Sequence, residues 1–367
     1  MRSSTTPPEL GTSKEAPEDV AAQSSQPKVL FARLLIGLIV LICAEVFSGA
    51  SLHAGLWSPW TLVVTYWLYF AHFFLFTTLA ARTGRTSLSS LYLWGVLFGL
   101  YESWITKVIW HGYSGDGKFA MGQIGPYGFS EISMVFLFHP VASFILPLTV
   151  TCLLCPSLRR LFPELSWFTA KSSGARMVQI YLIFSFAPVM AMNSGGPLNL
   201  ALNLAVAIIL LLALLRFARP ALTDSDGRRL VVFGCQGFAG LCVYLALLYG
   251  VAYAVLRPDG LPSVAVQLCT FVFYGLAIAG LWLHGRRKPL EAVDVLVERR
   301  ELKLVTILFA TLLAIALMLS GLAHNHLLYP PVVLNFVIWT PLGFVLTALS
   351  LAKGVRESYG MVKMRHE

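Results

Sequence analysis

Charged side chains are scarce in this chain of 367 residues, in which Asp, Glu, Lys and Arg make up 12% and hydrophobic residues 57%. A typical soluble protein is about 25% charged. So few polar groups cannot cover a water-soluble globule, and apolar runs long enough to cross about 30 Å of hydrocarbon recur along the whole chain. The scarcity of charge therefore excludes a folded soluble domain and predicts an all-α polytopic membrane protein.

Cysteine is also sparse, and its placement excludes a disulfide-based fold. All six cysteines lie in or at the ends of apolar segments, so no extracellular disulfide framework is expected. Cys152 and Cys155 have the spacing of a metal-ligand pair, but no His or Cys nearby in the sequence completes a site. We therefore expect small buried thiols, no metal and no cofactor.

The apolar segments predict about ten membrane-spanning helices in a single domain over residues 29–353. Residues 1–28 are rich in Ser, Thr, Pro, Glu and Ala without apolar periodicity, which is typical of a disordered tail, and residues 354–367 form a second polar tail. The expected spans cover residues 30–50, 60–80, 87–107, 129–153, 178–193, 198–215, 230–255, 263–284, 303–322 and 331–352.

The basic residues predict the orientation, because cytoplasmic loops of membrane proteins carry an excess of Lys and Arg. If the amino terminus is cytoplasmic, 24 of the 27 Lys and Arg residues fall in cytoplasmic segments, and Lys107, Lys118 and Arg257 fall outside. Both termini are therefore expected on the cytoplasmic side of the plasma (inner) membrane. The net charge of +9 then reflects anchoring in the lipid bilayer, and no nucleic-acid partner is expected.

The run Leu93–Trp110 is unusual because it carries a glutamate, Glu102, and a lysine, Lys107. A charged side chain at the centre of a membrane helix costs about 2.5–3.5 kcal/mol or more, so such groups face protein or water and pair with one another. We expect Lys107 to pair with Glu102 or Glu131. Because residues five positions apart do not share a helix face, a partner on another helix is favoured.

Other polar side chains are predicted at a similar depth. At about 1.5 Å per helical residue, Glu45, Glu102 and Glu131 fall in the extracytoplasmic third of the bilayer. By the same estimate His72 and His139 fall near mid-depth. Each has a purely structural alternative, since a membrane histidine often only hydrogen-bonds a neighbouring helix and Glu45 could belong to a structural ion pair.

The loop between the third and fourth expected spans, residues 111–128, contains six glycines together with His111 and Asp116. It lies over the level of the carboxylates, so it is a candidate lid or ligand-contacting loop, or else a plain flexible connector. The candidate substrate- or ion-binding residues are Glu45, Glu131, His72, His111 and Asp116.

The block from Ala44-Glu45 through Gly-Leu-Tyr-Glu-Ser-Trp (99–104) to Phe138-His139-Pro140 resembles a family of uncharacterised prokaryotic multi-pass membrane proteins. It is more distantly similar to CPBP-type intramembrane proteases, in which a glutamate on one helix and a histidine on the next activate a water. That resemblance implies these roles for Glu102 and His139. This chain departs from the protease motif, since it lacks paired glutamates and has no histidine in the expected fifth to seventh spans.

Three classes of function remain open. The first is a membrane-embedded enzyme acting on a lipid, lipid-linked or membrane peptide substrate, with Glu102 as general base or acid, His139 as its partner and Lys107 as electrostatic stabiliser. The second is a proton- or cation-coupled secondary transporter that uses Glu45, Glu102 and Glu131. The third is a non-catalytic membrane subunit whose charges only hold helices together or bind another protein.

Reporter fusions test the predicted orientation. Alkaline phosphatase fused after Glu367 should be inactive, because its disulfides form only outside the cytoplasm, and a fusion in the turn at residues 257–262 should be active. Phosphatase activity in the carboxy-terminal fusion would contradict cytoplasmic termini.

Overall fold

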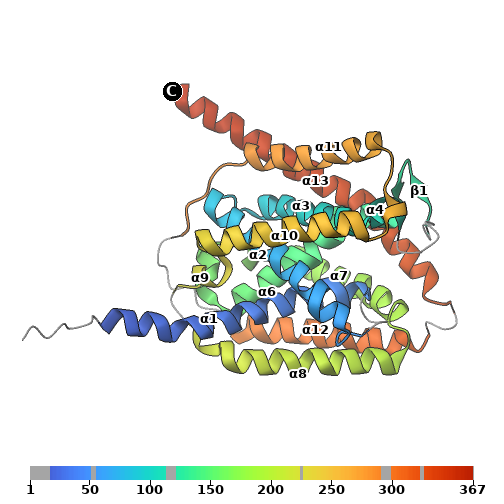
Figure 1. The fold of residues 1–367 in the computed structure, drawn as a ribbon, viewed down its shortest axis with the longest axis horizontal. Coiled ribbons are helices and arrows are strands. Elements are labelled where there is room, and N and C mark those ends of the chain that lie inside the picture. The colour runs from blue at the N-terminus through green and yellow to red at the C-terminus, as the bar shows by residue number, and fades with distance from the viewer. Residues whose placement is uncertain are drawn as a thin grey trace, which may run out of the picture.

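The computed structural model describes residues 17–50, 55–112, 121–223, 226–290, 299–322 and 326–366, without the side chains of residues 17–26 and 361–366. Most of its long helices run along a common direction, and the two ends of the described chain project from the same end of the bundle (Figure 1). Nine helices in the described residues are long and apolar enough to cross a membrane. The prediction of an all-α polytopic membrane protein is confirmed.

Helical stretches occur at all ten expected spans. They are α1 (Pro17–Leu41) with η1 (Ile42–Val46), η2 (Thr61–Thr65) with α2 (Tyr66–Thr83), α3 (Leu88–Thr106), α5 (Phe129–Ser133) with η3 (Met134–Ile145) and α6 (Leu146–Leu154), α7 (Ser173–Met192), α8 (Pro197–Leu222), α9 (Arg228–Val231) followed by α10 (Cys235–Val255), α11 (Val264–Leu283), α12 (Arg299–Ser320) and α13 (Tyr329–His366). The shorter elements are α4 (Val108–His111), the paired strands β1 (Gln123–Ile124) and β2 (Tyr127–Gly128), η4 (Pro156–Arg160), η5 (Pro163–Thr169) and η6 (Pro258–Gly260).

The helices extend further than the composition predicts. Residues 17–28, expected in the disordered tail, belong to α1, and the expected carboxy-terminal tail continues α13 as far as His366. Residues 1–16 lie outside the described part of the chain.

Helix α3 differs from the other spans because it is not among the nine helices apolar enough to cross a membrane on composition alone. It packs against η3, α11 and α2, and every side chain from Ser90 to Ile105 except Tyr101 is buried. A helix enclosed by other helices does not face lipid, so it tolerates polar side chains. Helix α3 is therefore the central helix of the bundle.

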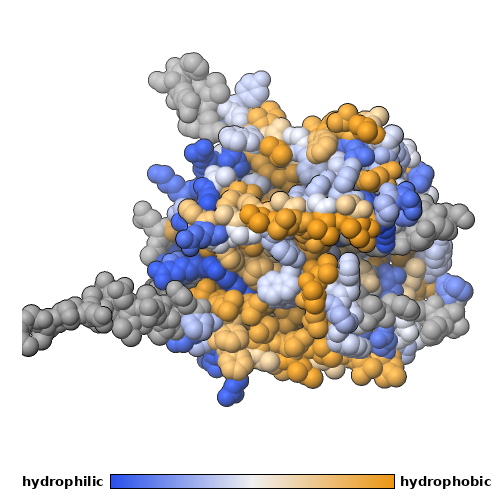
Figure 2. Space-filling view, in the orientation of Figure 1, coloured by the Kyte–Doolittle hydropathy of each residue, from blue (hydrophilic) through white to orange (hydrophobic). Residues whose placement is uncertain are grey.

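Helices α8 and α10 form part of the apolar exterior. Leu212 on α8 and Val243 on α10 are 62% and 58% exposed. Figure 2 shows hydrophobic residues along both helices and hydrophilic residues towards the two ends of the bundle. This distribution matches a surface that faces lipid at its middle and water at its ends.

Two glycines allow the close approach of α3 to η3. A Cβ atom at Gly95 would lie 2.4 Å from the Cα atom of Pro140, and one at Gly99 would lie 2.9 Å from the Cβ atom of His139. Small residues at such contacts are typical of membrane helix interfaces, since they let two backbones pack together.

Replacing Gly95 tests this contact. Gly95→Ala should lower the stability of the purified protein by about 1–3 kcal/mol, because the added methyl group meets backbone that cannot move freely. Gly250→Ala is the matched control, since a Cβ atom at Gly250 meets nothing within 4 Å. Thermal unfolding in detergent measures both variants, and an unchanged Tm for Gly95→Ala would contradict the packing.

Candidate functional site

Glu102 on α3 and His139 on η3 form a buried pair. The Nε2 atom of His139 lies 3.4 Å from the Oε2 atom of Glu102, and the two residues are 3% and 6% exposed. On the other side of the imidazole ring, Nδ1 lies 3.0 Å from the hydroxyl oxygen of Ser143. The Ser103 hydroxyl also donates to Oε2 of Glu102, at 3.5 Å. The carboxylate and the imidazole therefore belong to one polar chain inside the bundle.

The local sequence explains why these two side chains meet. Gly95, Gly99 and Glu102 follow one another at spacings of four and three, so they share one face of α3. The two glycines bring η3 close, and the carboxylate reaches His139 from the next turn. Segment η3 is a π-helix that contains Pro140, a residue that cannot donate a backbone hydrogen bond. Such π-helical segments are frequent at functional sites.

A cavity of about 230 Å³ lies beside Glu102. Its walls come from η1, η2, α2, α3, the start of α4 and the segment after α10. Because η1 and η2 are also π-helices, two such segments line the cavity, and the third, η3, contacts Glu102 through His139. The polar side chains that line the cavity are those of Glu45, Thr61, Thr65, Tyr69, Glu102, Thr106 and Arg257.

His72 and Glu131 lie near the pair but do not line this cavity. His72 is fully buried and interacts electrostatically with Glu102 and His139. Its Nδ1 atom lies 2.8 Å from the carbonyl oxygen of Leu68, whereas Nε2 has no hydrogen-bond partner among the described residues. His72 and His139, the two histidines predicted near mid-depth, therefore both lie near the same carboxylate.

Glu131 is a second buried carboxylate, 3% exposed. Its Oε1 atom accepts from Ser130 at 3.2 Å, and its Oε2 atom has no hydrogen-bond partner in the described part of the chain. It interacts electrostatically with Glu102 and with Arg257. Glu45 and Glu102 thus line the cavity and Glu131 does not, and the shared membrane depth of the three carboxylates stays a prediction.

Lys107 does not form either of the ion pairs that we expected with Glu102 or Glu131. Its ammonium group donates instead to the carbonyl oxygens of Tyr253 at 2.8 Å, Leu256 at 2.5 Å and Arg257 at 3.3 Å. The residue is fully buried and does not line the cavity. Lys107 therefore caps the end of α10, where the last carbonyl groups of a helix lack partners within the helix.

The remaining predicted residues have different positions. His111 ends α4, is half-buried and packs against Gly260 away from the cavity lining. Asp116 lies outside the described residues, as does the rest of the segment 113–120 of the glycine-rich loop. No group of three or more His, Cys, Asp or Glu side chains placed to hold a metal ion occurs within the described ranges.

Arg257 is the residue that the sequence interpretation missed. It is the basic residue of the cavity lining, and its Nη1 atom donates to the carbonyl oxygen of Gly112 at 2.7 Å. Its backbone has a φ of 49°, in the left-handed region that is uncommon for residues other than glycine. The sequence does contain a sign of this role, because Arg257 is one of the three basic residues predicted outside the cytoplasmic segments.

Lys107→Met tests the capping role. The substitution leaves three carbonyl groups without their donor, which should lower stability by about 1–3 kcal/mol in thermal unfolding. Lys303→Met is the matched control, because Lys303 is exposed and lies on α12. Equal Tm values for the two variants would show that Lys107 is not a structural cap.

Comparisons with known proteins give one curated relative. An "Uncharacterized protein" of Archaeoglobus fulgidus is 29% identical over 244 residues, which are 66% of this chain and 74% of the relative. No solved structure matches the chain significantly. The profile of a family described as "Uncharacterized membrane protein family" matches residues 34–359, which include every described residue of the cavity and of the Glu102–His139 pair. The chain therefore belongs to this membrane protein family.

Proposed function

We propose that this protein is a membrane-embedded enzyme that acts on a lipid, lipid-linked or membrane peptide substrate through general acid–base chemistry. The observation that carries the proposal is the 3.4 Å contact between Glu102 and His139 at the wall of a polar cavity. A carboxylate within reach of an imidazole can pass a proton to it, and acid–base catalysis requires such a pair near the reacting group.

The two residues have different positions relative to the cavity, which assigns them different roles. Glu102 lines the cavity, so its carboxylate is the group that meets the substrate as general base or acid. His139 lies behind it and shares its proton, while Ser143 at 3.0 Å orients the imidazole. Arg257 takes the role of electrostatic stabiliser that the sequence suggested for Lys107, because it lines the cavity and Lys107 does not.

The rim of the cavity supports a substrate that comes from the bilayer. Trp60 lines the cavity and is 59% exposed, and the neighbouring Leu62 and Val63 are 48% and 67% exposed. An exposed tryptophan beside exposed aliphatic side chains is typical of the membrane interface. On the predicted orientation, this rim faces the extracytoplasmic leaflet of the plasma membrane.

A proton- or cation-coupled transporter is the alternative, and the packing beyond Glu102 favours the enzyme. Phe98, one turn before Glu102 on α3, is fully buried and contacts both His72 and His139 at ring-centroid distances of 5.3 and 6.0 Å. These rings pack against one another behind Glu102 and do not line the cavity. A transport route would have to continue past them.

Glu102→Gln tests the proposal. The amide preserves size but cannot take a proton, so catalysis should fall by about 10²–10⁴-fold. Untargeted lipid and metabolite profiling of a deletion strain would compare complementation by wild type and by Glu102→Gln. The variant should leave the substrate accumulated, and His139→Gln should give the same profile.

Asp226→Asn provides the control, since Asp226 is half exposed and pairs with Arg229 at 3.1 Å far from the cavity in sequence. Membrane levels of all variants should match that of wild type, so that loss of complementation reports lost activity. Full complementation by Glu102→Gln would contradict the enzyme. Redistribution of an unmodified solute across the membrane, reproduced as pH-dependent uptake in proteoliposomes, would instead establish the transporter.

A further inference from the structure

A second and larger cavity, of about 440 Å³, lies between α7 and α13. Its wall includes Leu137, Phe138 and Val141 of η3, so it adjoins the segment that carries His139 without including the Glu102–His139 pair. The volume falls in the range of about 300–1,000 Å³ that is typical of small-molecule sites. This cavity is separate from the proposed active site, and a ligand could bind in it whatever the Glu102–His139 pair does.

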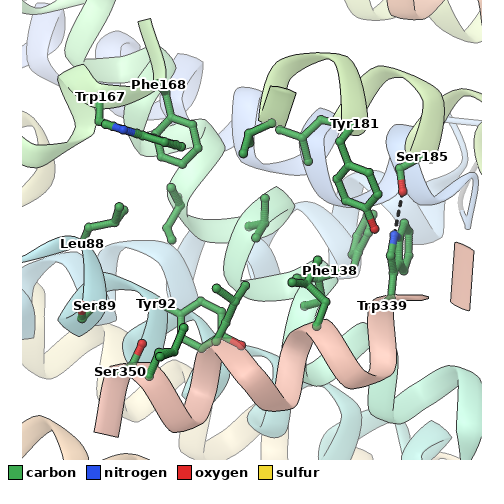
Figure 3. A pocket seen from close by; sticks show the side chains of 18 of the residues that line it. Leu88, Ser89, Tyr92, Phe138, Trp167, Phe168, Tyr181, Ser185, Trp339 and Ser350 are labelled. Carbon is green, nitrogen blue, oxygen red and sulfur yellow. Dashed lines mark hydrogen bonds between the residues drawn. The ribbon is translucent and has the colours of Figure 1, made fainter. Parts of the chain in front are cut away.

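One end of the cavity is apolar and aromatic. Phe138, Phe186 and Trp339 line it there, and the indole Nε1 of Trp339 donates to the Ser185 hydroxyl at 2.6 Å. Figure 3 shows this hydrogen bond at the opposite end of the cavity from Ser89 and Ser350. The indole N–H group is satisfied, so apart from the Tyr181 hydroxyl, which also lies here (Figure 3), this end suits hydrocarbon and offers little to a charged group.

The other end is polar and basic. Ser89 at the start of α3 and Ser350 on α13 line it, and Lys353 follows Ser350 by three positions on the same helix face. Within the described residues, the two hydroxyl groups make no hydrogen bond, and the ammonium group makes neither a hydrogen bond nor an ion pair. A half-buried ammonium group beside apolar walls is stabilised by an anion.

The acidic side chains of neighbouring elements are engaged with other groups. Glu164 accepts from the backbone N–H of Leu88 and pairs with Arg287. Glu357, one turn beyond Lys353, accepts from the backbone N–H of Gly285 at 2.9 Å. The anion that meets Lys353 is therefore expected to come from a ligand.

The dimensions of the cavity match one leaflet of a bilayer. Lys353 and Trp339 are fourteen positions apart on α13, which corresponds to about 21 Å along the helix. One leaflet of a bilayer, including its headgroup region, is about 20–22 Å thick. Trp167 lines the same cavity and is 38% exposed, as expected for an indole at the membrane interface.

We propose that this cavity binds an anionic phospholipid, with its phosphate against Lys353, Ser89 and Ser350 and one acyl chain directed towards Trp339. On the predicted orientation Lys353 faces the cytoplasm, and basic pockets between membrane helices on that side hold anionic headgroups. The second acyl chain of the lipid stays in the bilayer.

The proposed lipid site can be tested by measuring which lipids the purified protein retains. Purified protein in nanodiscs of equal parts phosphatidylglycerol and phosphatidylcholine would be released into detergent and weighed by native mass spectrometry. Wild type should retain phosphatidylglycerol in preference to phosphatidylcholine. Lys353→Met should reduce this retention about fivefold, the factor that corresponds to about 1 kcal/mol for one Lys near the membrane surface, and should leave phosphatidylcholine unchanged. Lys303→Met should behave as wild type.

Blocking the chain-binding end separates the cavity from general surface charge. Val178→Trp fills the cavity from α7 and should reduce retention of both lipids, whereas Val243→Trp on the exposed face of α10 should not. Leu349→Trp, at a lining position that is 60% exposed, repeats the test if Val178→Trp fails to fold. Equal retention of the two lipids by wild type, wild-type retention by Lys353→Met, or recovery of a free fatty acid alone would overturn the proposal.

Discussion

The cost of placing a carboxylate inside an apolar bundle is the constraint on which the rest of this structure depends. Glu102 is 6% exposed, and an unpaired charge at that depth would be strongly destabilising. The contact with His139, the Ser103 hydroxyl and the polar wall of the adjoining cavity together offset this cost. The glycines of α3 contribute as well, because they allow η3 to approach α3 closely enough for His139 to contact Glu102.

The sequence predicted the helices well because their signal is local. Runs of apolar residues of the right length identify each span. The candidate residues Glu102 and His139 are in contact, and Glu102 and Glu45 line one cavity, whereas their depth in the bilayer stays a prediction. The paired strands β1 and β2 and the helical ends of both tails were missed, since short polar segments carry little periodicity. Nothing in the composition distinguishes a π-helix from an α-helix, so η1, η2 and η3 could not be predicted as π-helical.

The partner of Lys107 could not be predicted for a different physical reason. Its three acceptors are backbone carbonyl groups of residues about 150 positions away, and every residue has such a carbonyl. Charge complementarity considers only ionised side chains, so it pointed to Glu102 and Glu131. Arg257 was used only as evidence for orientation. Basic residues are scarce on the extracytoplasmic side, so the presence of one there was itself a sign of a special role.

The enclosure of α3 has a consequence for how the protein is made. Every other span is apolar enough to enter the bilayer by its own composition, whereas α3 carries Glu102 and is not. An isolated helix of this kind partitions poorly from the insertion machinery into lipid. Its insertion is therefore expected to wait for a neighbouring helix, so that α3 enters the bilayer already partnered and the synthesis of η3, with His139, precedes its final placement.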